Sequence, residues 1–409
     1  MTRTDFDVLI VGGGMVGAAC AALLARELPR QRVAILEPRP VAMPTGDLDL
    51  RVSALSRASQ RLLARVGAWE AVLARGACAY ERMVVRDEAA SPGSVGSIEF
   101  DAASLGEPDL GHIAENLAVQ AALTARASAF GVTLLPTRLA SLDLQPDVAR
   151  VVTEDGRQIA AGLVVAADGS DSPARHLAGI GTQGHPYDQH AVVAHLRPER
   201  PHGRTARQRF LATGPLALLP LADGRVSLVW STSPGQAAEL LAMDAADFGA
   251  AVTRGSAGAI GDLALASGRA AFPLRLMHAR DYTRNRFALI GDAAHAVHPL
   301  AGQGVNLGLL DAGTLVQVIL DATSAGMEFG EARVLRRYER WRKAENVPAL
   351  AAMDGLKRVF AVSAPGAGAL RRLGVSLVDR CGPLKAALIR RAMGLDGDLP
   401  ALLGTPPRR

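Results

Sequence analysis

Cysteine is scarce in this chain, which has only Cys20, Cys78 and Cys381 among its 409 residues. They are scattered, no pair has a Cys-x-x-Cys spacing, and no group of Cys and His has the spacing of metal ligands. A disulfide framework and a zinc site are therefore disfavoured, and we expect no bound metal. We interpret the three cysteines as small apolar side chains in a reducing compartment.

The sequence also predicts no signal peptide, and it has no strong excess of one charge. The segment 8–25 is almost entirely apolar, but Asp5 and Asp7 precede it and three consecutive glycines interrupt it, so it resembles neither a signal peptide nor a membrane span. The net charge is +5, from 45 basic and 40 acidic residues, and no basic patch is interleaved with aromatics. We therefore expect a cytoplasmic protein that binds no nucleic acid.

The first motif lies near the N-terminus. Gly12, Gly14 and Gly17 form a Gly-x-Gly-x-x-Gly between a short apolar strand and a helix, and a second strand then ends in Glu37. The glycines allow a tight turn, close approach of a pyrophosphate to backbone N–H groups, and close packing of helix on strand. A carboxylate about 20 residues further on can accept hydrogen bonds from an adenosine ribose. This context predicts dinucleotide binding.

Two more motifs have an acid at the end of a buried strand. Asp168-Gly169 follows the apolar run 162–167, and Gly291-Asp292 follows the strand 287–290. After Asp292 comes a loop bracketed by Gly302 and Gly304 that begins a helix. An acidic turn followed by a helix N-terminus suits a ribityl chain and the electron-rich edge of a flavin. Because the carboxyl ends of parallel strands form the ligand-binding edge of an α/β sheet, all three motifs should meet there.

Other polar residues have two interpretations each. Arg51 either approaches the cofactor or is a solvated surface residue. Asn116 and Gln120 are one helical turn apart, so they either reach one ligand or serve as an N-cap and a surface residue. His295 and His298 either support phenol chemistry or fix the loop, and the sequence reveals no carboxylate that would orient either ring.

The order of these motifs resembles that of the single-component flavin aromatic hydroxylases of the para-hydroxybenzoate hydroxylase fold. Within that group, the ungapped run from His298 to Asp311 is similar to the pattern of the ubiquinone-biosynthesis hydroxylases. The likeness covers nearly the whole chain, and the regions of Arg51 and His112 and the tail look most like the 2-polyprenylphenol hydroxylases. The implied fold class is α/β: an FAD-binding Rossmann-like domain of the glutathione-reductase type, a mostly antiparallel β-sheet substrate domain, and a helical C-terminal region.

The resemblance implies the following boundaries. The FAD-binding domain is discontinuous and comprises residues 1–80, 101–180 and 273–345. The substrate domain comprises 81–100 and 181–272, and includes one helix over 236–252. The helical region is 346–409.

The resemblance also implies site residues. Those expected to bind FAD are Gly12, Gly14, Gly17, Glu37, Arg39, Arg51, Asn116, Gln120, Asp168, Gly169, Gly291, Asp292, Gly304, Val305 and Asn306. Those expected at the catalytic flavin edge are Pro299, Gly302, Gln303 and Gly304, with His298 as a weaker candidate.

The implied reaction is hydroxylation of the ring of a polyprenylphenol in ubiquinone biosynthesis. NADH or NADPH reduces FAD, and O₂ supplies the oxygen through a C4a-hydroperoxyflavin. Alternatives are a sister flavoprotein that acts at another ring position or reduces a prenyl chain, and a redox-silent FAD-binding subunit. Other ubiquinone-biosynthesis proteins are expected partners. The basic amphipathic tail has two interpretations. It contacts lipid or partner enzymes, in which case the protein is peripheral to the inner face of the membrane, or it caps the FAD domain.

Overall fold

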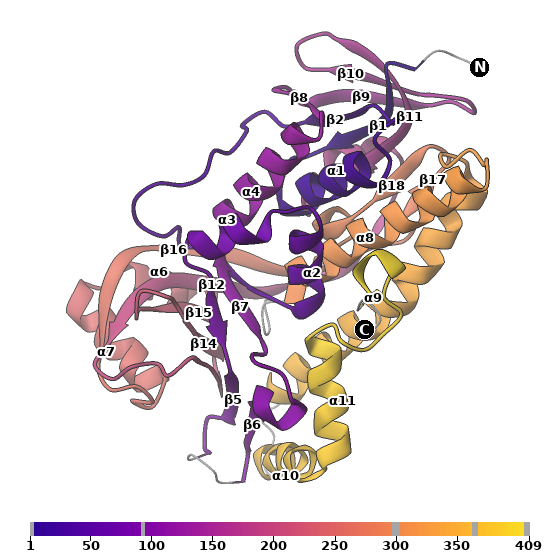
Figure 1. Cartoon of the computed structure of the whole chain (residues 1–409). Coiled ribbons are helices and arrows are strands. Elements are labelled where there is room, and N and C mark those ends of the chain that lie inside the picture. Colours follow the sequence, from indigo (N-terminus) through magenta and orange to yellow (C-terminus); the bar gives the residue numbers. More distant parts are fainter. Residues whose placement is uncertain (1–3, 91–94, 297–302, 362–366, 405–409) are drawn as a thin grey trace.

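Three β-sheets and their covering helices make up the molecule (Figure 1). We describe a computed structural model, in which residues 4–90, 95–296, 303–361 and 367–404 are described. The first sheet has the strand order β17-β18-β11-β1-β2-β8, and β10 and β9 extend it beside β11. Its strands are β1 Phe6–Val11, β2 Val33–Leu36, β8 Thr133–Leu135, β9 Leu139–Leu144, β10 Ala149–Thr153, β11 Gln158–Ala166, β17 Thr283–Arg284 and β18 Phe287–Leu289.

The central strands of this sheet are parallel and end together. Val11 of β1 pairs with Leu36 of β2 and with Ala166 of β11, and Ala166 pairs with Leu289 of β18. The first glycine motif, Glu37, Asp168 and Gly291 therefore follow neighbouring strands at one edge. The expected meeting of the three motifs at the carboxyl ends of the strands is thus confirmed. The strand before Asp168 is longer than the apolar run 162–167, because β11 runs unbroken from 158 to 166.

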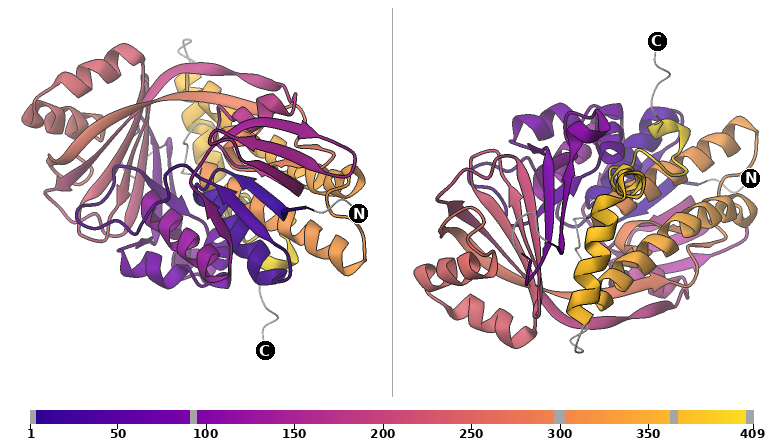
Figure 2. Two further views of the ribbon diagram at one scale, coloured as in Figure 1. Left: turned by 90° about the horizontal axis from the view of Figure 1, so that it is seen from above. Right: turned by 90° about the horizontal axis from the view of Figure 1, so that it is seen from below.

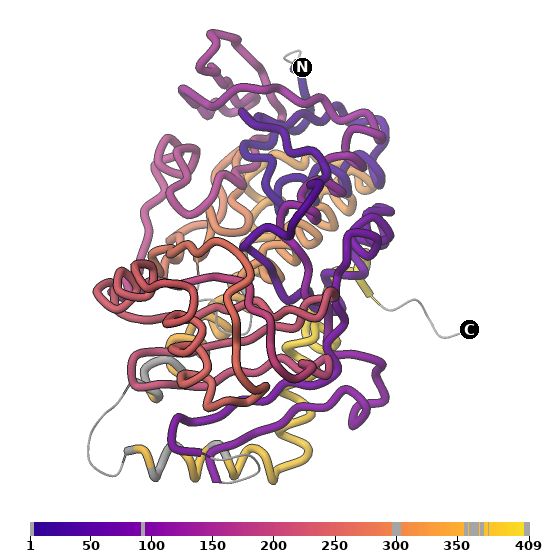
Figure 3. The backbone as a smooth tube through the Cα atoms, turned by 90° about the vertical axis from the view of Figure 1, so that its left-hand side faces the viewer, coloured from indigo at the N-terminus to yellow at the C-terminus, as the bar shows by residue number. Residues whose placement is uncertain are grey.

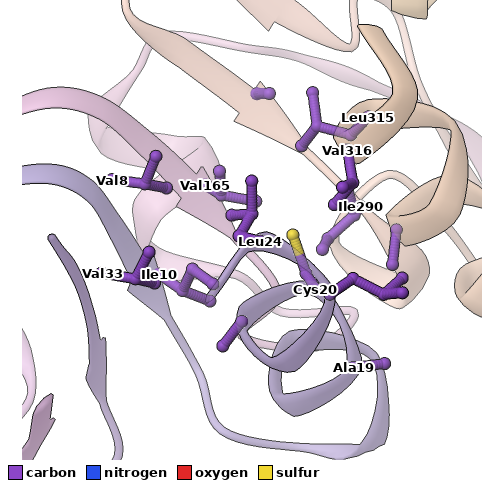
Figure 4. Close-up of a cluster of buried hydrophobic side chains, with 14 of the residues drawn as sticks. Val8, Ile10, Ala19, Cys20, Leu24, Val33, Val165, Ile290, Leu315 and Val316 are labelled. Carbon is purple, nitrogen blue, oxygen red and sulfur yellow. The ribbon is translucent and has the colours of Figure 1, made fainter. Parts of the chain in front are cut away.

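Helices pack against the sheet and against one another. The helices packed around it are α1 Met15–Glu27, α2 Arg57–Arg65, α3 Trp69–Ala74, α4 Asn116–Ala129, α5 Pro173–Leu177, α8 Gln303–Ser324 and α9 Ala332–Ala361. Figure 4 shows the core between β1, β11, α1 and α8, where Ile10, Leu24, Val165 and Leu315 are inaccessible to solvent. The window 304–324 of α8 has the length and mean hydropathy, 1.3, of a membrane span, but 67% of it is buried in the protein, as in a core helix.

The second sheet is mostly antiparallel and forms a separate layer of strands (Figure 2). Its strand order is β19-β16-β12-β15-β14-β13-β5-β6. Its strands are β5 Arg82–Asp87, β6 Ser97–Asp101, β12 Thr182–Pro198, β13 Thr205–Leu211, β14 Gly214–Pro220, β15 Val226–Thr232, β16 Leu263–Ala279 and β19 His295–Ala296. The helices α6 Pro234–Ala242 and α7 Ala245–Gly255 cover its outer face. The prediction of one helix over 236–252 was wrong, because Asp244 accepts a hydrogen bond from the N–H of Asp247 and caps a new helix.

A third, small sheet joins the two large ones in the order β3-β7-β4, with β3 Val52–Leu55, β7 Gly111–Glu115 and β4 Cys78–Tyr80. The segment before α4 is thus a strand. The predicted domain boundary at 272 falls inside β16, and the one at 345 falls inside α9. Single elements therefore run through both positions, and the division into domains stays a prediction.

The C-terminal helices α10 Ala367–Arg380 and α11 Gly382–Ala392 lie against the β5–β6 hairpin (Figure 3). The N–H of Gly96 in that hairpin donates to Ser376 of α10 at 3.0 Å. The chain then returns to α2, α8 and α9, where the indole of Trp341 donates to the carbonyl of Asp398 at 2.8 Å and Leu403 is buried. Short 3₁₀ turns are Ala102–Leu105, Gly291–Ala293 and Ala401–Leu403. Two cysteines, Cys20 and Cys78, are buried as expected, but Cys381 is exposed.

Candidate functional site

The glycine motif divides into packed positions and an open one. Gly12 has a φ of +98°, and a Cβ there would lie 2.5 Å from the carbonyl oxygen of Ala167. A Cβ on Gly17 would lie 2.0 Å from the carbonyl oxygen of Gly12. A Cβ on Gly14, in contrast, would meet no described atom within 4 Å. Gly12 and Gly17 are therefore required by packing, whereas Gly14 borders open space where another molecule can approach.

The helix that follows presents unpaired N–H groups to this space. Gly14 is the N-cap of α1, and no described side chain caps it. The first turn also carries no acidic side chain. Because the first N–H groups of a helix have no partner within the helix, this end is suited to a phosphate.

Glu37 and Gln120 both hold the backbone of Gly13. One oxygen of Glu37 accepts from the N–H of Gly13 at 2.9 Å and the other from the N–H of Arg39 at 3.0 Å. The amide nitrogen of Gln120 donates to the carbonyl of Gly13 at 2.8 Å. These two side chains thus fix the glycine turn, and their predicted contact with a cofactor stays a prediction.

Asp168 uses both of its oxygens within the protein. The hydroxyl of Ser172 donates to one at 2.5 Å, and the N–H of Ala174 donates to the other at 2.9 Å. Burial raises the pKa of Asp168, while these two hydrogen bonds oppose the rise. Gly169 has a φ of +84° and no atom near its missing side chain. Asp168 therefore orders the turn that starts α5.

Arg175 connects the second motif to the third. Its guanidinium donates to the carbonyl of Ala293 at 2.9 Å and to that of Ser170 at 3.0 Å, and the residue is 3% exposed. Burial lowers the pKa of Arg175, and Asp168 opposes this effect. The turn after β11 and the turn after β18 are thus held together by one buried cation.

The third motif carries a carboxylate at this edge that has no partner among the residues the structure describes. Gly291 has a φ of +60° and lies against Val16 of α1, as does Gly308 of α8. The next residue, Asp292, is exposed and has neither a hydrogen bond nor an ion pair with any residue of the described ranges. The surrounding protein desolvates this carboxylate and so raises its pKa. An accessible but poorly hydrated carboxylate is typical of the wall of a cleft.

A buried ionic network lies behind this motif. Asp311 of α8 is fully buried, and its carboxylate accepts from the N–H of Gly291 at 2.9 Å and from Arg342 at 2.7 Å. It also lies 2.6 Å from Nε2 of His295 and accepts from Asn346 at 3.1 Å. Burial alone would raise the pKa of Asp311, but His295 and Arg342 hold it at about 2. The view that no carboxylate orients His295 was therefore wrong.

Asn306 anchors the start of α8. Its side-chain oxygen accepts from the N–H of Ser56 at 2.9 Å and from the hydroxyl of Ser59 at 2.7 Å. Its amide nitrogen donates to the carbonyl of Ala54 at 2.8 Å. The neighbouring Gly304 and Val305 are partly buried in the first turn of the same helix. Asn306 thus fixes the helix N-terminus against β3 and α2.

The remaining predicted residues are peripheral or lie outside the described ranges. Arg51 is exposed and lies over the ring of Phe272 at 5.9 Å, which links the third sheet to the second. Asn116 accepts from the hydroxyl of Ser53 at 2.7 Å, and Arg39 is exposed. His298, Pro299 and Gly302 lie outside the described residues, and Gln303 is the first residue of α8.

These residues fit FAD. An uncapped helix N-terminus borders open space and suits a pyrophosphate, and an unpaired carboxylate on a neighbouring turn can accept hydrogen bonds from ribityl hydroxyls. The helix α8, with no acid in its first turn, directs a second N-terminus toward the same edge and can stabilise negative charge on an isoalloxazine. The three features lie on one sheet edge, as binding of a single extended molecule requires.

Comparison with known proteins decides the family. A family model described as "FAD binding domain" matches residues 5–347. The "3-demethoxyubiquinol 3-hydroxylase" of Escherichia coli is 37% identical over 97% of this chain and 100% of its own length. The chain belongs to the family of FAD-dependent ubiquinone-biosynthesis hydroxylases.

Further matches agree. The "Ubiquinone biosynthesis monooxygenase COQ6, mitochondrial" of Xenopus tropicalis is 36% identical over 94% of this chain and 92% of its own length. The p-nitrophenol 4-monooxygenase PnpA of Pseudomonas putida is 18% identical, with a TM-score of 0.75 over 97% of this chain and 99% of that one, which shows a common fold. The predicted fold class, FAD as cofactor and the class of flavin-dependent ring monooxygenase are confirmed.

Sequence reasoning missed Arg175, Asp311, Arg342 and Asn346. Asp311 is the last residue of the run from His298 that resembles the family pattern. Its separation from His295 along the chain matches no helical or strand spacing, so the sequence does not indicate that the two side chains meet. Only the packing of α9 on α8 brings Arg342 and Asn346 to it. The signal available was the presence of polar residues within otherwise apolar helix faces, because such residues are buried only with partners.

Proposed function

We propose that this FAD-dependent monooxygenase hydroxylates the aromatic ring of a prenylated ubiquinone precursor, with NADH or NADPH as reductant and O₂ as oxygen donor. The names of the relatives describe enzymes of ubiquinone biosynthesis, which supports a prenylated aromatic substrate for this chain. The observation that carries the proposal is the unpaired, accessible carboxylate of Asp292 on the edge where the three motifs meet. The carboxylate of Asp292 can therefore bind the cofactor, whereas the carboxylates of Glu37 and Asp168 already accept hydrogen bonds from the protein.

The chain's own groups bind and orient. Gly14 and the first N–H groups of α1 would hold the pyrophosphate of FAD, and Asp292 would accept hydrogen bonds from its ribityl hydroxyls. The first turn of α8, fixed by Asn306, would place its N–H groups at the isoalloxazine. When bound, FAD supplies the redox chemistry and the activation of O₂. The Asp311 network keeps the turn at Gly291 in place, and Asp311 itself is fully buried.

An apolar pocket supports the prenylated nature of the substrate. It has a volume of about 460 Å³ and is lined by Leu307 and Leu310 of α8, Pro348 and Met353 of α9, and Leu388 of α11. Asn306, at the helix N-terminus described above, also borders it. A flexible apolar chain gains stability there by removing its surface from water.

We also propose that the protein is cytoplasmic and touches the inner face of the membrane, or partner enzymes bound there, through α10 and α11. Large apolar side chains on these helices are exposed: Leu373 by 52%, Leu377 by 60% and Leu384 by 46%. Several basic residues of the same region have acidic partners instead. Lys385 pairs with Asp379, and Arg390 pairs with Asp396. We therefore expect apolar insertion to contribute more to this contact than charge.

Liposome flotation with the double variant Leu373→Glu/Leu377→Glu tests this contact. Binding should be lost, whereas Leu177→Glu/Leu241→Glu, which changes exposed leucines elsewhere, should leave it intact. Equal flotation of both double variants would refute the lipid contact.

The activity itself is tested with the purified holoprotein. Oxidation of NADH or NADPH should rise on addition of a short-chain polyprenylphenol, and oxygen from ¹⁸O₂ should appear on the ring of the product. Bound FAD without substrate-stimulated oxidation would instead favour a redox-silent subunit.

The ring position needs a cellular experiment. We propose the position hydroxylated by 2-polyprenylphenol hydroxylases, because the regions of Arg51 and His112 and the tail look most like that subfamily. Mass spectrometry of quinone intermediates in cells lacking the gene would identify the position from the species that accumulates. Accumulation of a demethoxyubiquinol would assign the later hydroxylation instead.

A further inference from the structure

A second cavity lies on the outer face of the second sheet, apart from the edge where the three motifs meet. It has a volume of about 600 Å³, and Leu216 and Leu218 of β14 form part of its floor. These two leucines belong to the face that packs against α6 and α7. Leu219, on the opposite face of the same strand, packs toward the third sheet. The sheet itself therefore separates this cavity from the FAD edge.

Strand register concentrates arginine in this cavity. In the parallel pairing of β13 with β5, Arg209 is beside Arg86 and Arg207 is beside Val84. Arg82 lies on the same face of β5, because residues two apart on a strand share a face. With Arg200, five arginines line the cavity, against the two acids Glu88 and Glu99.

Three of these arginines have backbone partners, which position them without neutralising them. Arg200 donates to the carbonyl of Gly258 at 2.8 Å. Arg207 donates to the carbonyl of His202 at 2.9 Å, and Arg209 donates to that of Gly255 at 2.9 Å. Burial lowers the pKa of Arg207, and the positive charges of Arg86, Arg82 and Arg200 lower it further. Like charges on adjacent strands repel, so this arrangement costs stability unless an anion offsets it.

Arg82 and Arg86 have free guanidinium groups. Among the residues that the structure describes, neither side chain has a hydrogen-bond or ion-pair partner, and Nε of Arg86 is shielded from solvent. The carboxylate of Glu88 accepts from the N–H of Ala212 at 2.7 Å and makes no ion pair with either arginine in the described ranges. A shielded donor without a partner is costly, and a bound acceptor would remove that cost.

We propose that this arginine cavity binds the phosphate groups of a small molecule. Guanidinium is planar and offers paired N–H donors that match phosphate oxygens. A phosphate ester carries nearly two negative charges at neutral pH, which suits the excess of arginines over glutamates. The cavity has the volume typical of small-ligand sites, and Val84, Leu216 and Leu218 offer apolar surface to the organic part of the ligand.

Calorimetric titration of the FAD-loaded protein with inorganic pyrophosphate, at constant ionic strength, tests the proposal. We expect binding of one pyrophosphate, with Kd raised about tenfold or more in Arg82→Gln/Arg86→Gln because two charge-assisted contacts are lost. The control Arg333→Gln/Arg337→Gln removes the same charge from exposed positions on α9 and should bind like the wild type. FAD content and the unfolding midpoint show that each variant is folded.

A second binding experiment, with lipid vesicles, distinguishes a free phosphate compound from a lipid headgroup. Binding of soluble pyrophosphate, lost in Arg82→Gln/Arg86→Gln, assigns a free phosphate compound. Binding only to vesicles that contain phosphatidic acid, lost in the same variant, assigns a lipid headgroup. If Arg82→Gln/Arg86→Gln binds either probe as tightly as the wild type, or if no probe binds the wild type, the proposal is overturned.

Discussion

Asp292 and Asp311 belong to the same motif segment but have opposite surroundings. Asp292 is exposed and unpartnered within the described ranges, and the surrounding protein raises its pKa. Asp311 is fully buried, contacts four groups, and has a pKa of about 2. The difference shows how the chain separates two tasks: one carboxylate is left free for a ligand, and the other holds the turn from which the first projects.

Replacement of the buried acid should have the largest effect. Asp311→Asn leaves the cation of Arg342 buried without its counter-charge, which typically costs about 3–5 kcal/mol. We expect a large fall in the free energy of unfolding, measured by urea titration. Asp321→Asn is the control, because Asp321 lies on the same helix but is partly exposed and pairs with Arg337 near the surface. Similar unfolding midpoints for both variants would show that the network contributes little.

The glycine motif offers a second contrast between packed and open positions. Gly12→Ala should lower the free energy of unfolding by roughly 1–3 kcal/mol, because φ is positive and the added Cβ meets the carbonyl of Ala167. Gly14→Ala should change the stability of the apoprotein little while weakening FAD binding, since its Cβ enters the space assigned to the pyrophosphate. Unchanged FAD affinity in Gly14→Ala would place the pyrophosphate elsewhere.

The smallest effect concerns pH. Burial, with His295 and Lys343 nearby, lowers the pKa of His278 to about 4. Because the unfolded chain binds this proton near pH 6.5, the free energy of unfolding should fall as the pH drops from about 6.5 to about 4. Asp311, with a folded pKa of about 2, adds to the slope only at the low end of that window, where the carboxyl of the unfolded chain begins to bind a proton. In His278→Gln the slope should flatten, and an unchanged slope would assign it to other groups.

The location of residues that directly follow a strand could be predicted from the sequence. The partners that a buried side chain finds on a distant helix could not. The strands before Gly12, Asp168 and Gly291 are short apolar runs, so their meeting at one edge followed from parallel pairing. The pairing of Asp311 with Arg342 depends on how α9 packs on α8, which no local pattern encodes. The cap at Asp244 was likewise overlooked, because the apolar pattern continues across it.

The dissociation constant of FAD, measured with apoprotein by flavin fluorescence quenching, tests the central claim most directly. Asp292→Ala should bind FAD about 10–100-fold more weakly than the wild type, because the hydrogen bonds from the ribityl hydroxyls to a charged acceptor are lost. Its apoprotein should keep the wild-type urea midpoint, since Asp292 has no partner among the described residues. An unchanged dissociation constant for FAD would contradict the assignment of Asp292 as the ligand-facing acid.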